Sequence, residues 1–216
     1  MRKIPCLFVR EFFGGLPPSL TEEVTPGCEW ALAGKGIATR KWDGTACMVK
    51  NGNLYKRYDY KAQRRTKALP EGAIPCDPEP DEMTGHWPHW VPVTVAKEDR
   101  WHRLAWRHHQ VLCYGTFELI GPMINGNRED VSGLEFRAHG ADRIRIKIET
   151  AGHHGREIPW TFHTIKAILS MLPFEGIVFH HVDDDTRRCK IRRKDYGLPW
   201  PVHGDHYDTD VGGKVC

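Results

Sequence analysis

Apolar side chains recur at helical spacing in two segments of this chain. In residues 159–173 they return every three or four positions between two prolines, which predicts an amphipathic helix that is bounded at both ends. Residues 97–109 show a shorter pattern of the same kind. The residues predicted to face the core are Phe162, Ile165, Ile168, Leu169 and Leu172 in the longer helix, and Trp101, Leu104 and Ala105 in the shorter one.

Elsewhere the apolar residues lie in short runs bounded by glycine, proline or asparagine, and such runs predict strands. The clearest is a hairpin in which residues 45–50 and 53–58 flank the two-residue turn Asn51-Gly52. A second predicted hairpin joins residues 174–182 to residues 187–194 through an acidic turn. The other predicted strands are residues 7–9, 24–30, 36–41, 111–122 and 131–148.

Residues 68–96 break this pattern, because they contain six prolines. Proline lacks a backbone donor and clashes with the preceding turn, which excludes a regular helix here. Trp87 and Trp90 are unusual in a disordered segment. We therefore predict an ordered loop that is held in place by its tryptophans.

The composition, with 40% hydrophobic and 27% charged residues, is typical of a soluble globular protein of one domain. We expect that domain to span residues 1–216, with residues 1–35 as an N-terminal packing extension and residues 68–96 as an insertion. No apolar run reaches the roughly 20 residues of a membrane-spanning helix, and Arg10-Glu11 ends the apolar N-terminus too early for a secretory signal. Seven cysteines without a Cys-x-x-Cys pair favour free thiols in a reducing cytoplasm.

Basic residues are concentrated in two runs, residues 61–67 and 187–194, although the net charge is only +3. A single basic run is most often a solvated face. Two such runs in a chain that also has a candidate catalytic lysine favour phosphate binding instead.

The candidate catalytic lysine is Lys41, at the end of the predicted strand 36–41 and directly before an Asp-Gly turn. Strand and turn fix the backbone of the lysine, so that only its side chain remains to be aimed. Lysine followed at this spacing by Asp-Gly is the signature of covalent nucleotidyltransferases. An ordinary turn after a strand is the alternative, which these four residues alone do not exclude.

Two polar residues in other predicted strands are further candidates. Arg57 would pair across from Ala46, close to the Asp-Gly turn, and could there reach a phosphate near Lys41. Glu118 is a single carboxylate within the apolar run 111–122, and a buried carboxylate without a donor is costly. It therefore accepts either from a neighbouring backbone amide or from a ligand hydroxyl, and both remain open.

The register of the second hairpin predicts a charged face. If its turn has two or four residues centred on Asp184-Asp185, Ile177 lies opposite Arg192 and Phe179 lies opposite Lys190. Three cations and one carboxylate would then share a face, which suits a polyanion with a metal. That face would carry Glu175, Lys190, Arg192 and Lys194, and the core face Val178, His180, Cys189 and Ile191.

These residues together resemble the ATP-dependent RNA ligases of the covalent nucleotidyltransferase superfamily. The resemblance is to the small family of 5′-phosphate, 3′-hydroxyl RNA ligases that has vertebrate and microbial members. Four motifs match in order across residues 37–198, and this order is more specific than any one motif. The matching segments are Lys41-Trp42-Asp43-Gly44, Phe117-Glu118-Leu119-Ile120-Gly121-Pro122, Glu175-Gly176-Ile177-Val178 and Lys190-Ile191-Arg192.

The resemblance implies an α+β fold, the ATP-grasp-like ligase nucleotidyltransferase fold, in which two antiparallel sheets sandwich the nucleotide and few helices flank them. It also implies ATP, Mg²⁺ (or Mn²⁺) and RNA with 5′-phosphate and 3′-hydroxyl ends, with no membrane and no obligatory protein partner. The implied roles are catalysis by Lys41, Glu175 and Lys190; nucleotide binding by Lys41, Asp43, Gly44, Arg57, Glu118, Glu175, Lys190, Arg192 and Lys194; and metal binding by Glu175. The charge density of the basic run 61–67 predicts RNA binding by Lys61, Arg64, Arg65 and Lys67.

The chemistry explains these residue types. Lys41 must attack the α-phosphate of ATP as a neutral amine, and nearby cations favour loss of its proton and neutralise charge on the phosphoryl group. Glu118 would accept from the ribose hydroxyls, and Arg57 would contact phosphate. The fifth motif usually reads Lys-x-Lys, so Arg192 replaces a compact ammonium by a planar fork, and Lys194 could share its role.

Two alternative functions remain open, beside two minor metal-site interpretations. DNA ligases and capping guanylyltransferases share the motifs but usually carry an oligonucleotide-binding barrel, for which too few residues follow Lys194. A non-catalytic nucleic-acid-binding module would not need Lys41, Glu118 and Glu175 together. A zinc site among the 13 histidines lacks the usual Cys-x-x-Cys or His-Glu-x-x-His spacing. Metal binding by the acidic turn 183–185 is the minor interpretation of that segment.

Overall fold

In a computed structural model, the chain forms two compact units. The first consists mainly of Asp43–His139, and the second of Ile4–Trp42 together with the residues from Gly140 onward. The boundary therefore falls directly after Trp42, inside the motif that contains Lys41. The structure describes residues 2–15, 18–61, 68–82, 84–108, 114–145, 147–150, 153–157 and 159–202.

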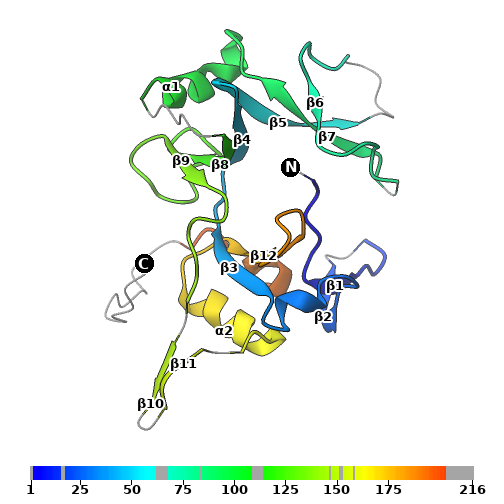
Figure 1. Cartoon of the computed structure of the whole chain (residues 1–216), viewed down its shortest axis with the longest axis vertical. Helices are drawn as coiled ribbons and strands as arrows, with labels where there is room; N and C mark the ends of the chain where they lie inside the picture. Colours follow the sequence, from blue (N-terminus) through cyan, green and yellow to red (C-terminus); the bar gives the residue numbers. More distant parts are fainter. Residues whose placement is uncertain are drawn as a thin grey trace. The chain divides into compact units, whose positions relative to one another are not determined.

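The first unit is built on one antiparallel sheet with the strand order β6-β7-β5-β4-β8-β9 (Figure 1). One face of this sheet is apolar and is covered by α1, whose Ala105 is fully buried against Val49 and Leu119. The other face carries polar residues of the motifs. The elements are β4 (Thr45–Lys50), β5 (Asn53–Lys61), β6 (Ile74–Pro75), β7 (His86–Pro92), η2 (Lys97–Asp99), α1 (Arg100–His108), β8 (Gly115–Ile120) and β9 (Glu135–Ala138).

The second unit has a three-stranded sheet in the order β13-β12-β3, and α2 packs on its apolar face (Figure 1). Two hairpins, β1-β2 and β10-β11, complete the strands described here. The elements are β1 (Phe8–Glu11), β2 (Ser19–Val24), η1 (Glu29–Ala31), β3 (Gly36–Lys41), β10 (Lys147–Thr150), β11 (His153–Glu157), α2 (Phe162–Met171), β12 (Gly176–His181), β13 (Arg188–Arg192) and η3 (Arg193–Tyr196).

Both predicted helices are present. Helix α2 begins with a capping box, in which the Thr161 hydroxyl accepts from the Thr164 amide at 3.2 Å and the Thr161 amide donates to the Thr164 hydroxyl at 2.8 Å. In α1 the prediction for Leu104 is wrong, because this side chain is exposed while Ala105 is buried. Trp101 packs against the sheet as predicted.

The prediction of a loop throughout residues 68–96 is wrong, because β7 pairs with β5 over its whole length. Its prolines do not break that ladder. The Pro88 carbonyl accepts from the Cys76 amide at 2.9 Å, so the backbone of Pro88 faces the two-residue strand β6. Pro92 lies four residues after Pro88, so its backbone faces the same side of β7. The N–H groups that these two prolines lack would therefore have pointed away from β5, and the ladder between β5 and β7 loses no hydrogen bond. Trp90 is buried. The described residues between 68 and 96 contain no helix, as predicted, and the short η2 begins at Lys97.

Two other predicted strands are wrong in extent. The strand predicted at residues 131–148 is two strands in different units, β9 and β10, and Gly140 turns between them with a φ of 83°. The alternation continues on both sides of this turn, so the pattern hides the break. The strand predicted at residues 24–30 lies earlier, in β2, because Gly27 turns the chain with a φ of 86° and η1 follows.

The predicted α+β class with antiparallel sheets and few helices is confirmed. The two-residue hairpin turn at Asn51-Gly52 is also confirmed, since Lys50 pairs with Asn53. Within the described part of the chain, no helix has the length and apolar character to cross a membrane.

Candidate active site

Lys41 is the last residue of β3 and lies directly opposite Gly176 of β12. Its ammonium donates to the Glu175 carboxylate, and it also donates to the Trp42 carbonyl at 3.3 Å. The two side chains of this ion pair are largely buried, with 22% and 12% of their surfaces exposed for Lys41 and Glu175. The nucleophile predicted from the first motif is therefore in contact with the carboxylate predicted from the fourth.

The predicted register of the β12–β13 hairpin is wrong by one residue. Gly176 lies opposite Arg192, and Val178 lies opposite Lys190. The turn has five residues, 182–186, because the His181 amide bonds to the Arg187 carbonyl at 3.1 Å. An odd turn length moves each side chain of one strand to the other face. The core face is therefore Ile177, Phe179, Cys189 and Ile191, all fully buried.

Lys190 and Arg192 nevertheless share the outer face of the sheet with Lys41. Lys41, Gly176 and Arg192 form one row across the three strands. Thr39, Val178 and Lys190 form the next row. Lys194 does not join them, because β13 ends at Arg192 and Lys194 is exposed on η3. The prediction that Lys194 projects from this face is wrong.

Arg192 is held in place by Asp195. Its guanidinium donates to both carboxylate oxygens, at 3.1 and 2.9 Å, and Arg10 forms an ion pair with the same carboxylate at 2.8 Å. Burial pushes the pKa of Asp195 upward, but the bonds and charges of Arg192 and Arg10 outweigh it and hold this pKa below its usual range. The Arg192 guanidinium thus forms a bidentate contact with the Asp195 carboxylate. A lysine at this position could not form two parallel hydrogen bonds to it.

Replacing Asp195 by asparagine should lower the free energy of unfolding by about 3 kcal/mol at pH 7, because two partly buried arginines lose their counterion. The folded-state pKa of Asp195 is depressed, so its stabilisation is present above the unfolded pKa of about 3.9 and is lost as pH falls through the folded value. The difference between the two proteins should therefore shrink below about pH 4.

Urea unfolding at pH 7, 5 and 3 measures this difference. Asp59→Asn is the matched control, since its exposed carboxylate pairs with Arg57 at the surface and its loss should cost under about 1 kcal/mol. An equal loss at all three pH values would show that the Asp195 charge is not what stabilises the fold.

In the first unit, Arg57, Ala46, Glu118 and Arg137 form one row across the sheet. Across the sheet, Glu118 and Arg137 lie opposite each other on β8 and β9, and Ala46 of β4 lies opposite Glu118. The last regular pair of β4 and β5 is Cys47 with Lys56. Arg57 is the next residue on β5, so it lies in register with Ala46 and on the same face of the sheet. Arg57 and Glu118 therefore emerge from the same face, on either side of the strand that follows the Asp-Gly turn. In the described structure Arg57 pairs with Asp59 at 3.1 Å.

Glu118 has a partner for each carboxylate oxygen. Oε1 accepts from the Gly44 amide at 3.1 Å, and Oε2 lies 2.9 Å from Nε2 of His139. The backbone-amide bond is thus present, and it ties the third motif to the glycine of the first. A carboxylate has about four acceptor positions, so a ligand hydroxyl can still be accommodated.

The Asp43-Gly44 turn is clamped by a loop that sequence reasoning did not connect to it. The Asp43 amide donates to Glu129 at 2.6 Å, and the Asp43 carboxylate accepts from Asn125 and Arg128, each at 3.1 Å. Asn125-Gly126-Asn127 is typical of a turn, but the partners in this loop lie more than 80 positions away from Asp43 and no local signal links them.

Glycine is required at positions 44 and 176 because the backbone of a neighbouring strand lies very close to each of them. A Cβ on Gly44 would lie 2.2 Å from the Leu119 carbonyl oxygen, and one on Gly176 would lie 2.3 Å from that of Ile191. Any side chain at either position would force two neighbouring strands apart. Trp42, between the two halves of the first motif, donates through its indole to Asp142 at 2.7 Å and carries the Arg40 guanidinium 3.6 Å above its ring.

The predicted RNA-binding run is described only at Lys61, the last residue of β5; Arg64, Arg65 and Lys67 lie outside the described residues. Among the described residues, no group of three or more metal-ligating side chains is found. Magnesium does not need such a group, because it keeps several waters and is usually held by one or two carboxylates and substrate phosphates. Glu175, beside cations that suit a phosphate, fits that requirement.

Comparison with known proteins shows similarity to RNA ligases. The chain is 29% identical to RNA ligase 1 of Mus musculus and 28% identical to RNA ligase 1 of Rattus norvegicus, each over 93% of this chain and 82% of the relative. A solved structure of an apo mutant of a Naegleria gruberi RNA ligase aligns with a TM-score of 0.39 and 17% identity, covering 76% of this chain and 52% of that chain, so this chain spans about half of it. No protein-family model matches the chain. The similarity to the two mammalian sequences confirms that the chain is related to the RNA ligases, as its four motifs predicted.

Proposed function

We propose that this chain is an ATP-dependent RNA ligase that seals 5′-phosphate and 3′-hydroxyl ends through a covalent lysyl-AMP intermediate. The observation that carries the proposal is the contact between Lys41 and Glu175 on a sheet face that also bears Lys190 and Arg192. A lysine nucleophile, a carboxylate and two cations are the groups that nucleotidyl transfer needs. The similarity of the chain to two mammalian RNA ligases supports the proposal.

In the first step, Lys41 Nζ loses its proton and attacks the α-phosphorus of ATP. A P–N bond forms, and the bond between the α- and β-phosphates breaks, so that pyrophosphate leaves. Glu175 holds Nζ at the end of β3, which fixes the direction of attack. Lys190 would neutralise charge on the phosphoryl oxygens. When bound, a magnesium ion at Glu175 supplies further charge neutralisation to the phosphates.

In the second step, an oxygen of the RNA 5′-phosphate attacks the phosphorus of lysyl-AMP, and Lys41 leaves as the amine. In the third step, the RNA 3′-hydroxyl attacks the 5′-phosphate, a phosphodiester forms, and AMP leaves. Asp43 and Gly44 would position the nucleotide through the turn that Glu118 and the loop 121–130 hold rigid. Glu118 would accept from the ribose hydroxyls, and Arg57 would reach a phosphate.

A cytoplasmic location is part of the proposal. The five described cysteines are all free thiols, which fits a reducing compartment. A DNA ligase or a capping-type nucleotidyltransferase is the second candidate, because the same residues serve the same first step. The preference for RNA comes from the similarity to the mammalian RNA ligases.

The test is an intact-mass measurement of the purified protein after incubation with ATP or GTP in magnesium. We expect an AMP adduct with ATP and little GMP adduct. Nicked duplexes with RNA or DNA strands then identify the substrate, and RNA should be sealed faster. The absence of any nucleotide adduct would overturn the covalent mechanism, and preferential sealing of DNA would select the second candidate.

His139→Ala should raise KM for ATP by about tenfold, because Glu118 loses a charge-assisted hydrogen bond and is no longer fixed toward the ribose. The rate of adduct formation at saturating ATP should change less. If Glu118 reads the ribose hydroxyls, preference for ATP over 2′-deoxy-ATP should fall in parallel. The measurement is the initial rate of adduct formation with both nucleotides.

His163→Ala is the control for that experiment. Its imidazole is 74% exposed and lies 3.5 Å from the exposed Glu22, so its loss should leave both rates unchanged. An unchanged ribose preference in His139→Ala would mean that this bond only braces the fold.

A further inference from the structure

The outer face of the three-stranded sheet extends beyond β3. Residues 142–144 run along the free edge of this strand, where the Arg40 amide donates to the Asp142 carbonyl and the Ile144 amide donates to the Ala38 carbonyl, both at 2.8 Å. An isolated antiparallel bridge pairs Thr39 with Arg143. Opposed residues share a face, so Arg143 lies in the row of Thr39, on the face that carries Lys41.

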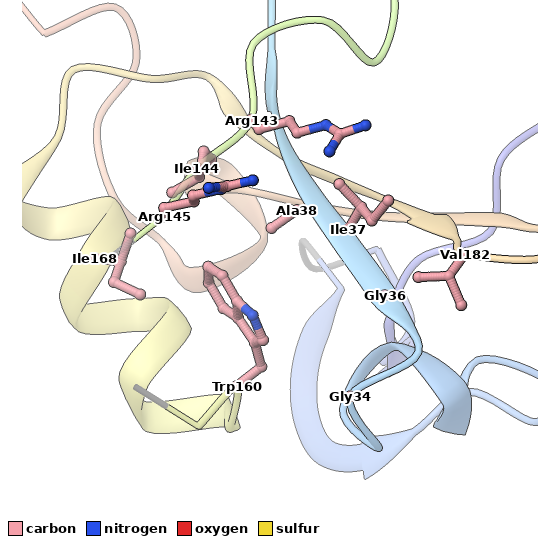
Figure 2. A pocket seen from close by; sticks show the side chains of 10 residues that line it. All are labelled: Gly34, Gly36, Ile37, Ala38, Arg143, Ile144, Arg145, Trp160, Ile168 and Val182. Carbon is pink, nitrogen blue, oxygen red and sulfur yellow. The ribbon is translucent and has the colours of Figure 1, made fainter. Parts of the chain in front are cut away.

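A pocket of about 230 Å³ opens at this edge. Figure 2 shows Arg143 and Arg145 on one side of it, with Trp160 and Ile168 on the other; Ala38 of β3 lies on the same side of the strand as Trp160, and Ile37 on the opposite side. All of these residues belong to the second unit. The ring of Trp160 packs edge-to-face on the buried Phe179 with centroids 5.2 Å apart, so this wall is part of the core.

The lining selects for an anion with an apolar or aromatic part. Its described residues include two exposed arginines and no carboxylate. Guanidinium groups form paired hydrogen bonds to phosphate, and indole and guanidinium planes stack on nucleobases. The pocket is smaller than the roughly 300–1,000 Å³ of sites for whole drug-sized ligands, which fits one base or one nucleotide of a longer strand.

The position of the pocket separates it from the adenylation site. Ile37 and Lys41 are four residues apart on β3, which corresponds to about 13 Å. A group bound beside Ile37 is therefore distant from Lys41, whereas Arg143, opposite Thr39, lies at the end of the pocket that is nearer to Lys41. A strand of RNA, in contrast, could occupy both places along one sheet edge.

We propose that this pocket binds one nucleotide of the substrate RNA, with a backbone phosphate on Arg143 and Arg145 and the base against Trp160. The proposal rests on the proposed function in that RNA is the strand bound. It adds a contact away from the four motifs, and it predicts that the pocket serves RNA binding and sealing but not adenylation.

The experiment measures binding of 5′-phosphorylated single-stranded RNA over a salt series, together with AMP-adduct formation. Arg143→Ala/Arg145→Ala should bind RNA more weakly, and the slope of log K against log salt should fall by about 0.7 for each lost phosphate contact. Trp160→Leu should weaken binding about fivefold or more with an unchanged slope, because stacking releases no counterions. Trp160→Phe keeps a ring and should bind nearly as the parent protein does.

Adduct formation with ATP should be unchanged in the double arginine variant, which also shows that the variant is folded. Lys97→Ala/Arg107→Ala removes two exposed cations from the other unit and should leave RNA affinity and salt slope unchanged. An unchanged affinity and slope in the double arginine variant would overturn the proposal. So would a loss of adduct formation with RNA affinity retained, which would assign the pocket to ATP.

The outcome is distinguishable from failure of the proposed function. If the parent protein forms no AMP adduct, the ligase mechanism falls, while the RNA salt series still measures the pocket. If the parent protein forms the adduct and the pocket variants bind RNA with parent affinity, only the pocket assignment falls.

Discussion

A Lys41→Ala protein should form no detectable AMP adduct and should fail to join 5′-phosphate RNA with ATP, yet it should still join RNA whose 5′ end already carries adenylate. The lysine is needed as the covalent carrier in the first two steps, and pre-adenylated RNA bypasses both. The side chain is also in contact with Glu175, so its loss leaves that carboxylate without its ammonium. Joining of pre-adenylated RNA is therefore expected to be slower than in the parent protein.

A gel of ligated product for both substrates measures this prediction. Lys35→Ala is the matched control, because Lys35 is exposed just before β3 and its removal should affect neither reaction. Sealing of 5′-phosphate RNA by Lys41→Ala at the parent rate would exclude the covalent mechanism. Loss of both reactions in a folded protein would mean that Lys41 also positions the end in the third step.

Lys190→Ala separates the role of a phosphate-binding cation from that of the carrier. Lys190 lies in the row next to Lys41 on the same face, and its charge would meet the same phosphate in each step. This variant should therefore be poor on both substrates, unlike Lys41→Ala.

The parts of the site that sequence predicted are those decided by neighbours in the chain. Lys41 follows from a strand of six residues and an Asp-Gly turn, and the hairpin around Asn51-Gly52 follows from its turn residues. Helix α2 follows from its spacing and from prolines on both sides. In each case the local preference and the final structure agree.

The parts that sequence did not predict depend on contacts between distant segments. The hairpin of β12 and β13 has a five-residue turn, and nothing in Asp183-Asp184-Asp185 distinguishes five residues from four. Strand β7 forms despite its prolines because β5 supplies a complete ladder on one side. The clamp on Asp43 and the bond from His139 to Glu118 join residues between 21 and 86 positions apart.

The change of register leaves the two cations of β13 on one face. Lys190 and Arg192 have the same parity on β13, so they share a face in either register. The observed register differs from the predicted one in which residues of β12 lie beside these cations. Ile177, predicted on the charged face, is buried in the core. The shared face of the two cations therefore came from spacing, whereas their neighbours required the structure.

Glu175→Gln should lower the rate of adduct formation by roughly 10²–10³-fold. The amide keeps the shape of the side chain and a hydrogen bond to Lys41, but it removes the negative charge. If that charge served only to hold the lysine, its loss would ease release of the proton from Nζ and the rate would rise. If the carboxylate binds the metal that neutralises the phosphates, its loss must slow the reaction.

The sign of the change in rate thus decides between the two roles. Initial rates of adduct formation at several magnesium concentrations measure it, and in Glu175→Gln the concentration needed for half the maximal rate should rise. Glu22→Gln, whose parent side chain is 65% exposed, controls for loss of a carboxylate from the same unit. A rate equal to or above that of the parent protein, with an unchanged magnesium dependence, would leave Glu175 as a restraint on Lys41 and would require another ligand for the metal.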